Sequence, residues 1–275
     1  MDQIIVDASK KRFSINFKEL WAYKDLFLVL AYRDYRVRYS QTFLGLVWAF
    51  IQPFTTLIIF IIVFGKAARI DTSPVPYPLF AVCGMAAWTY FSFVLSQSGS
   101  SIISSQAMIQ KIYFPRLIIP LSKALVGLVD FGITFIFVIV LLIVYKHPPS
   151  INLLFLPGFI LINLIAALGV GIWLSALTIR YRDFQHVIPF LVQFGLYATP
   201  VAYPAHLIIK SLSPWAVTFY YLNPMAGVVE GFRWSIIGGA APNAYCFVSF
   251  TMVLIIFITS LVYFRKTERI MADIV

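Results

Sequence analysis

Residues 33–53 read RDYRVRYSQTFLGLVWAFIQP and join a basic segment to an apolar one. The basic segment carries Arg33, Arg36 and Arg38 among tyrosines. From residue 43 to residue 64 the chain has no charge, and a helix of that length can cross the hydrocarbon core of a bilayer. Arginines crowded at one end of a first span hold that end in the cytoplasm. The junction therefore predicts how the whole chain is oriented in a membrane.

The composition places the 275-residue chain in a bilayer. Hydrophobic residues make up 61% and charged residues 12% of the chain, with a mean hydropathy of +0.88. A soluble domain does not need that much apolar surface, and the apolar runs are too long for strands, so we expect an all-α integral membrane protein. The net charge of +10 reflects membrane topology rather than nucleic-acid binding, because the basic residues lie beside apolar spans. The two cysteines, Cys83 and Cys246, fall inside predicted spans, so a structural disulfide is not expected.

Six transmembrane spans are predicted, at residues 43–64, 79–98, 120–145, 153–178, 185–203 and 243–264. Between the last two, residues 204–242 are apolar pieces cut by four prolines, and each piece is too short to cross. We expect a pair of re-entrant helices there. Residues 1–16 and 265–275 are expected to be cytoplasmic tails. Of the 21 lysines and arginines, 16 fall on the predicted cytoplasmic side and five on the other, which supports six spans with both termini inside.

A helix that lies along the membrane surface is predicted before the first span, at residues 17–42. On a helical wheel one face is apolar and aromatic, and it consists of Phe17, Leu20, Trp21, Leu28, Ala31 and Tyr35. Lys18, Asp25 and Arg36 lie to the side. This pattern is typical of an amphipathic interface helix. An ordinary juxtamembrane helix without a partner is the alternative.

Four ionisable residues fall in or near the predicted spans. Lys123 and Asp130 are seven residues apart, so they stack on one helix face and can partly neutralise each other through water or a neighbour. Glu230 and Arg233 have the i, i+3 spacing of an intrahelical ion pair. The sequence holds no HExxH, GxSxG or GxxxxGKS/T pattern. We therefore expect no catalytic residue and no metal site, and any ATP would be bound by another chain.

Five stretches together resemble one family of transporters. They are RVRYSQTFLGLVWAFIQP (36–53), QKIYFPRLIIPLSKALVGLVD (110–130), RYRDFQHVIPFLVQFGLYATPVAYP (180–204), YYLNPMAGVVEGFRW (220–234) and YFRKTERIMADIV (263–275). In this order, over most of residues 20–275, they resemble ABC-2 type permeases. The branch they resemble exports cell-surface polysaccharides: O-antigen, capsular polysaccharide and teichoic acids.

This resemblance implies a homodimer of six-span subunits in the bacterial inner membrane, with two cytoplasmic ATPase subunits that bind the ATP and magnesium. No cofactor is expected in this chain itself. The implied substrate is a glycan on a polyprenyl pyrophosphate lipid, with O-antigen as the favoured polymer. The resemblance also implies an interface helix at 17–39, a coupling helix around 100–114 and re-entrant helices at 204–240 on the periplasmic side. An exporter of another substrate (teichoic acid, capsule, or a small lipid or drug), an autonomous channel or carrier, and a membrane glycan transferase are the alternatives.

Three groups of residues are candidates for function within this frame. Arg33, Arg36 and Arg38 could receive the pyrophosphate headgroup, because planar guanidinium groups suit phosphate oxygens. Their alternative role is membrane topology and attraction to anionic lipids. Gln110, Lys111 and Tyr113 are predicted to contact the ATPase, because their polar segment lies between two spans on the cytoplasmic side. Aromatic faces that could line a glycan channel are those of Tyr77, Phe80, Trp88, Tyr197, Tyr203, Trp215, Phe219, Tyr220 and Tyr221; an ordinary interfacial aromatic belt is the alternative.

Overall fold

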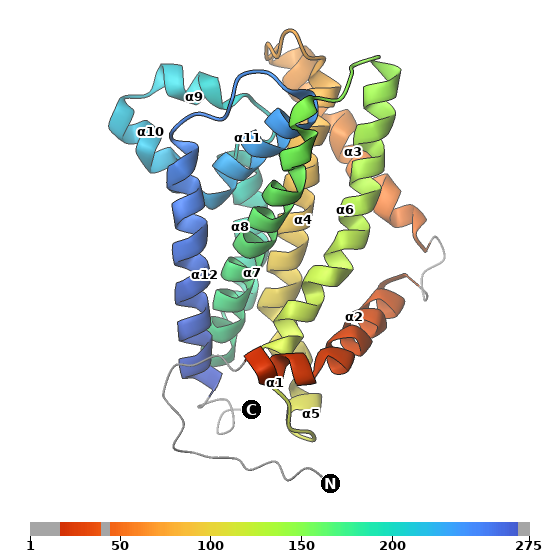
Figure 1. Ribbon diagram of the computed structural model, residues 1–275, viewed down its shortest axis with the longest axis vertical. Helices are drawn as coiled ribbons and strands as arrows, with labels where there is room; N and C mark the ends of the chain where they lie inside the picture. Colours follow the sequence, from red (N-terminus) through yellow and green to blue (C-terminus); the bar gives the residue numbers. More distant parts are fainter. Residues whose placement is uncertain (1–16, 40–44, 269–275) are drawn as a thin grey trace.

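The computed structural model describes residues 17–39 and 45–268. The predicted tail 1–16, the end of the predicted interface helix at 40–42, and residues 269–275 lie outside the described residues. Within the described ranges every regular element is a helix, which confirms the all-α class (Figure 1). The helices are α1 (Phe17–Ala22), α2 (Lys24–Tyr39), α3 (Val47–Phe60), the π-helical η1 (Ile61–Ala67), α4 (Tyr77–Ser104), α5 (Gln106–Ile109), α6 (Ile118–Val144), the 3₁₀ turn η2 (Ile151–Phe155), α7 (Leu156–Arg180), α8 (Phe184–Ala198), α9 (Ala205–Ser211), α10 (Pro214–Tyr220), α11 (Pro224–Ile237) and α12 (Cys246–Glu268).

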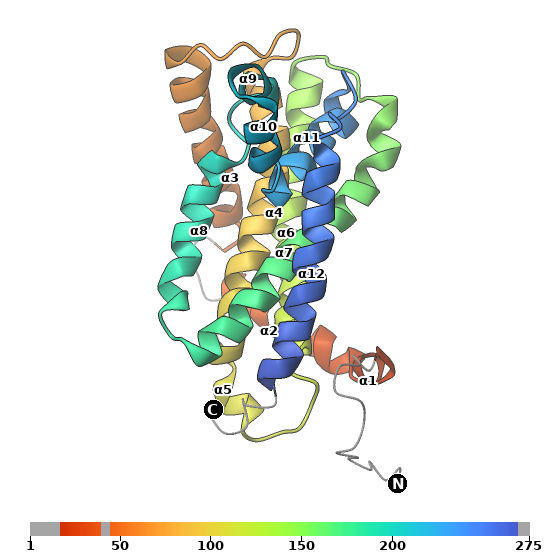
Figure 2. The ribbon, with the colours of Figure 1, turned by 90° about the vertical axis from the view of Figure 1, so that its left-hand side faces the viewer.

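The bundle is built around α4. Nineteen of its 28 residues are buried, against three of 14 in α3, so α4 is central and α3 is peripheral. Helices α6 and α7 pack against α4, and α12 packs against the other side of α7 (Figures 1 and 2). The faces that α3, α6, α7 and α12 turn outward are rich in exposed isoleucine, leucine, valine and phenylalanine, which suits contact with lipid.

The two ends of the bundle carry different short helices (Figures 1 and 2). Helices α1 and α5 lie at one end, which we call the α5 end. Helices α9 and α10 lie at the opposite end, which we call the α9 end. Each long helix from α4 to α7 runs from one end to the other, and α12 returns from the α9 end to the α5 end.

Five helical stretches are long and apolar enough to cross a membrane: Val47–Ala67, Tyr77–Ser104, Ile118–Val144, Ile151–Arg180 and Cys246–Glu268. The predicted span 185–203 is represented by α8, which has 15 residues and is therefore about 22 Å long. That is shorter than the roughly 30 Å hydrocarbon core, so α8 is not among the five. The described residues thus form an integral membrane protein with five candidate spans.

The segment 204–242 contains three helices, so the expected pair is wrong in number. Helices α9 and α10 have seven residues each, and α11 has 14. Helix α11 is mostly buried between α4, α7 and α12, whereas α9 and α10 lie outside the bundle. Helix α11 ends at Ile237. The next residue, Gly238, has a φ of +75°, a conformation that glycine adopts without strain.

The side of α2 that packs on the bundle only partly overlaps the predicted apolar face, with which it shares Ala31. Leu30 and Ala31 are buried against α6, and Asp34 forms an ion pair with that helix. Trp21 and Leu28, both on the predicted face, are 74% and 56% exposed. The membrane-surface role of the predicted apolar face stays a prediction, and Asp34 and Arg38 contribute ion pairs on the side of α2 that contacts α6.

Small residues bring α7 close to its neighbours. The Cα position of Gly171 faces Ser98 of α4, and Gly169 faces the backbone of Phe257 in α12. Small residues at helix contacts let backbones approach closely in a membrane, where there is no hydrophobic force between helices.

Replacing Gly171 with alanine should lower the melting temperature of the protein in detergent. The added Cβ would lie 2.7 Å from the Ser98 Cβ, and overpacking of this kind costs about 1–3 kcal/mol. Gly158→Ala is the matched control, because it lies in the same helix and its Cβ would meet no atom within 4 Å. Thermal unfolding of both variants measures the difference. Equal melting temperatures would contradict a close contact between α4 and α7.

Candidate functional site

Helix α8 ends at Ala198, and the irregular chain that follows it has backbone carbonyl groups that no helical turn satisfies. Arg233 of α11 reaches two of them: its Nη1 donates to the Pro200 carbonyl and its Nη2 to the Val201 carbonyl, each at 2.5 Å. Its Nε donates to the carbonyl of Phe80 in α4 at 3.3 Å, and its Cζ lies 3.6 Å from the centre of the Phe80 ring. One buried guanidinium group therefore joins α4, α11 and the chain that follows α8.

Other side chains satisfy the remaining carbonyls of this break. The Tyr203 hydroxyl donates to the Tyr197 carbonyl at 3.0 Å, and the Tyr77 hydroxyl donates to the Ala202 carbonyl at 2.9 Å. The Asn223 amide donates to the Ala198 carbonyl at 3.3 Å. With Arg233, these residues give five carbonyls between 197 and 202 a side-chain donor. We call this set of contacts the carbonyl cap.

The ion pair expected between Glu230 and Arg233 is not formed. Among the ion pairs of the described residues, none includes either side chain. Glu230 instead accepts hydrogen bonds from the Tyr221 hydroxyl and, at 3.4 Å, from the Cys246 thiol. The spacing rule failed because Arg233 has three carbonyl acceptors, two beyond α8 and one in α4, and Glu230 faces the end of α10 and the start of α12.

Helices α9 and α10 rest on a small apolar cluster of their own. The cluster consists of Ala205, Val217, Tyr221, Ala226 and Cys246 and is separate from the main core around α4. The Asn223 amide also donates to the Thr199 hydroxyl at 2.9 Å, so the two chain segments that lead into and out of α9–α10 are tied together. The pair of helices is therefore a compact unit attached to the bundle at one place.

Sequence reasoning missed Asn223, although a signal for it was present. Its side-chain oxygen accepts the Met225 N–H at 3.0 Å and caps α11, and Pro224 occupies the first helical position. An asparagine followed by proline is a typical start of a helix. The Asn223–Pro224 dipeptide thus indicates where α11 begins, but it does not indicate the hydrogen bonds from Asn223 to Thr199 and Ala198.

The charges of α6 are neutralised by α2. Lys123 pairs with Asp34 at 2.5 Å, and Asp130 pairs with Arg38 at 2.8 Å. Asp130 also accepts a hydrogen bond from the Tyr39 hydroxyl. Lys123 and Asp130 were expected to be neutralised through water or a neighbour. The structure shows neutralisation by a neighbouring helix, α2.

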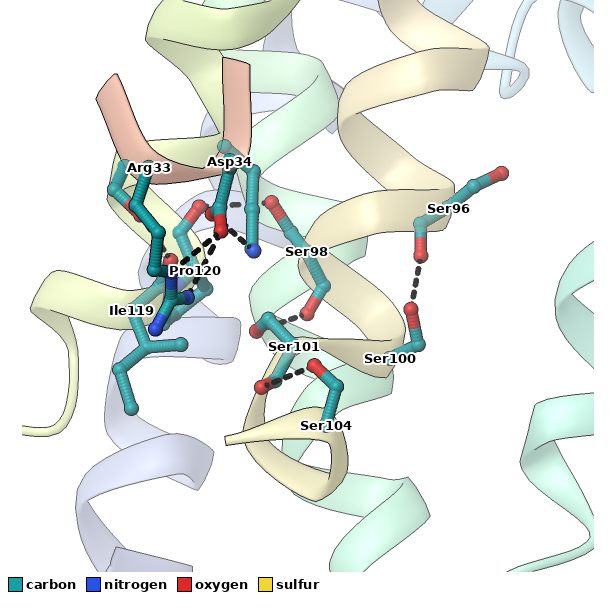
Figure 3. Close-up of polar contacts among 11 residues, drawn as sticks. Arg33, Asp34, Ser96, Ser98, Ser100, Ser101, Ser104, Ile119 and Pro120 are labelled. Atoms are coloured by element: carbon teal, nitrogen blue, oxygen red, sulfur yellow. Dashed lines mark hydrogen bonds and ion pairs between the residues drawn. The ribbon is translucent and has the colours of Figure 1, made fainter. Parts of the chain in front are cut away.

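The three arginines proposed for the headgroup have different surroundings. Arg33 contacts Asp34 at 2.8 Å and its side chain is 46% exposed (Figure 3). Arg36 is exposed and lies over the Tyr32 ring, 5.8 Å from its centre. Arg38 is engaged by Asp130 and lies over the Phe93 ring at 4.4 Å. The described structure therefore leaves Arg33 and Arg36 more open to an outside ligand than Arg38.

The predicted ATPase-contact residues lie at the tip of the α5 end. Gln110, Lys111 and Tyr113 are all exposed, and the loop they belong to, residues 109–116, surrounds a hollow of about 240 Å³. The Tyr113 hydroxyl donates to Glu19 of α1 at 3.4 Å. Partial desolvation and the Glu19 carboxylate raise the pKa of Tyr113 above its usual value, so this phenol stays protonated at neutral pH.

The serine-rich end of α4 leads to this loop and is satisfied within the protein. The Ser98 hydroxyl donates to the Pro120 carbonyl of α6 at 2.8 Å, which ties the two helices together (Figure 3). Ser101 and Ser104 each donate to a carbonyl one turn earlier in α4, at 2.6 and 2.9 Å. These bonds let α4 continue to Ser104 through residues whose composition had indicated a polar loop.

The nine aromatic residues proposed for a glycan channel do not share one surface. Exposed are Tyr197, Trp215 and Phe219; half-buried are Tyr203 and Tyr220; buried are Tyr77, Phe80, Trp88 and Tyr221. Two of the buried residues, Tyr77 and Phe80, contribute to the carbonyl cap or stack on its arginine. Their contacts account for them without a ligand, and a channel role for any of the nine stays a prediction.

Comparisons with known proteins agree on one family. A sequence model described as ABC-2 type transporter matches residues 25–237. A protein of Klebsiella pneumoniae named O-antigen export system permease protein RfbA is 27% identical over 251 residues, which are 91% of this chain and 95% of that protein. A protein of the same name from Myxococcus xanthus is 27% identical over 216 residues, 78% of this chain and 82% of that protein. The polysialic acid transport protein KpsM of Escherichia coli is 22% identical over 210 residues, 75% of this chain and 79% of that protein.

Replacing Arg233 with glutamine should strongly destabilise the protein. The change strands the Pro200 and Val201 carbonyls, and an unsatisfied buried group costs about 1–3 kcal/mol. Lysine should rescue little, because a single ammonium group lacks the guanidinium fork that reaches several acceptors. Yield and melting temperature in detergent are the measurements, with Arg69→Gln in an exposed loop as the control. If Arg233→Gln and Arg69→Gln have the same melting temperature, Arg233 does not stabilise the irregular chain after α8.

Proposed function

The chain belongs to the ABC-2 type transporter family, and we propose that it is the membrane-spanning permease subunit of an exporter of a lipid-linked cell-surface polysaccharide. The observation that carries this proposal is the alignment of 91% of the chain with a relative named O-antigen export system permease protein. O-antigen is favoured over a capsular polymer because the identity to that relative is 27%, against 22% to the polysialic acid transport protein. Teichoic acid, capsule or a small lipid or drug is the runner-up cargo.

The energy for export comes from a separate ATPase. The sequence has no GxxxxGKS/T pattern, so ATP and magnesium are bound by cytoplasmic partner subunits, two for a homodimer of this chain. The exposed loop 109–116 at the α5 end is the contact with the ATPase, because it protrudes beyond the bundle and offers Gln110, Lys111 and Tyr113. The α5 end is therefore the cytoplasmic end, and both chain termini lie on that side of the bacterial inner membrane.

The sixth crossing is made by α8 together with the chain that follows it. Helix α8 begins at the α5 end, and residues 199–203 carry the chain on toward the α9 end. A break at membrane depth requires that protein groups satisfy the freed backbone, since no water is available there. The carbonyl cap meets that requirement. We therefore assign α9, α10 and α11 to a re-entrant segment at the outer side, where α9 and α10 narrow the exit of the path.

The substrate headgroup and glycan use different ends of the molecule. Arg33 and Arg36 at the α5 end are open to the pyrophosphate of the lipid carrier, and Arg38 is less available because Asp130 engages it. Tyr197, Trp215 and Phe219 are the aromatic residues open to a sugar chain near the α9 end. Aromatic faces make apolar contact with sugars without fixing one sequence, which suits a polymer that must slide.

A glycan transferase is the candidate from another class. It requires an acid or base placed to act on a lipid-linked sugar. The half-buried Glu230 is in contact with a tyrosine and a cysteine, and the described carboxylates Asp34 and Asp130 are in ion pairs. None of these carboxylates has the open, paired arrangement that transfer chemistry uses, so the transporter is preferred.

Export should require both the ATPase partner and ATP. In proteoliposomes containing the permease and its ATPase, lipid-linked glycan should become accessible to an impermeant probe on the far side only with hydrolysable ATP. Lys111→Cys should crosslink to the ATPase, and Arg69→Cys, placed near the α9 end, should not. Export without the ATPase would identify an autonomous carrier, and consumption of the glycan without its crossing would identify a transferase.

Cysteine labelling tests the re-entrant assignment. Lys210→Cys and Ala240→Cys are exposed positions on either side of α10 and α11, and both should react with an impermeant maleimide added outside intact cells. Met225→Cys, buried at the start of α11, should be protected. The native Cys83 and Cys246 are buried and add no background. Labelling of position 240 only from the cytoplasmic side would mean that the segment crosses the membrane and that the six-span topology is wrong.

A further inference from the structure

The last turn of α12 is fastened to the loop between α5 and α6. The Arg116 Nη1 donates to the Glu268 carbonyl at 2.8 Å, and the Arg116 backbone N–H donates to the Glu268 carboxylate at 3.3 Å. Arg265, one turn earlier, pairs with the same carboxylate at 3.0 Å. Hydrogen bonds from a guanidinium group are charge-assisted, so Arg116 fastens the described end of α12 to this loop.

The first turns of α12 are fastened to the segment at the other end of the bundle. The Ser249 hydroxyl lies 2.8 Å from the Tyr221 carbonyl and 2.9 Å from the Asn223 carbonyl, and it accepts the Gly227 N–H at 3.3 Å. The Cys246 thiol contacts Glu230. A Cβ on Gly227 would lie 3.0 Å from the Ser249 Cβ, so α11 and α12 are in close backbone contact. The connection between α10 and α11, and α11 itself, are thereby held to α12.

Between these two attachments α12 is one uninterrupted helix. Its 23 residues contain no proline or glycine, and they span about 35 Å (Figures 1 and 2). The peripheral helices α3 and α8 each contain a proline. Kinks in helices arise mainly at proline, at glycine and serine pairs and at π-bulges, so α12 transmits displacement along its axis better than α3 or α8.

We propose that α12 is a rigid strut that carries movement of the loop 109–116 to the α9–α11 segment, with Arg116 and Glu268 as positioning residues. The proposal rests on the proposed function, in which the ATPase acts on that loop. It requires that the contact between Arg116 and Glu268 stays formed throughout the transport cycle. It also requires that the middle of α12 stays stiff, although that part contacts no proposed ligand.

The stiffness of α12 can be changed at two lipid-facing positions. Leu254 and Ile255 are 54% and 47% exposed and lie halfway along the helix. The pair Leu254→Gly/Ile255→Gly loosens the backbone, and the pair Leu254→Ala/Ile255→Ala removes the same side chains without loosening it. In proteoliposomes the glycine pair should export about tenfold less glycan than the alanine pair, while basal ATP hydrolysis of the two complexes stays within about twofold. Labelling of Trp215→Cys in α10 should respond to ATP in the alanine pair and not in the glycine pair.

Equal export by the two pairs would overturn the strut. If the glycine pair fails to assemble with the ATPase, the double variant Arg116→Cys/Glu268→Cys tests the strut proposal instead. Export by this variant should be low when its thiols are free and should recover when a short bifunctional thiol reagent joins them, because a strut needs a permanent attachment. Loss of export on crosslinking would show that the contact must open and would reject the proposal. Absence of ATP-driven export by the wild-type complex would instead reject the proposed function.

Discussion

Every backbone carbonyl in a bilayer needs a donor, and this requirement shapes the α9 end of the molecule. A helix supplies its own donors, but α8 has only 15 residues and is shorter than the roughly 30 Å hydrocarbon thickness. The carbonyl cap replaces the missing turns. Its donors come from α4, α11 and the connections around α10, so the break can exist only when all of these are already packed together.

The cap also explains the placing of Arg233. A charge buried in a membrane protein is costly unless it is paired or hydrogen-bonded. Backbone carbonyl oxygens carry partial negative charge, and those of Pro200 and Val201, just beyond α8, accept from this guanidinium at 2.5 Å, with an aromatic ring on its face. Arg233 therefore needs no carboxylate, and Glu230 is left to bond with Tyr221 and Cys246. The same arginine excludes a side chain at Gly84 of α4, because a Cβ there would lie 2.6 Å from its Nη2.

Local sequence patterns predicted what depends on local physics. Uncharged apolar runs long enough to cross a bilayer predicted the helical class, and prolines predicted that residues 204–242 would be broken. Contacts between distant segments were beyond such patterns. Asp34 and Arg38 of α2 pair with residues some 90 positions away in α6, and two of the three acceptors of Arg233 are the carbonyls of Pro200 and Val201, beyond the end of α8. Spacing within one helix therefore misassigned the partners of Glu230 and Arg233.

The ion pairs between α2 and α6 bear on the order in which the chain is made. Asp34 leaves the ribosome 89 residues before Lys123, the residue whose charge it neutralises. A lysine or aspartate at the centre of a spanning helix costs about 2.5–3.5 kcal/mol on insertion. When α6 is synthesised, its counter-charges are already present on an earlier part of the same chain.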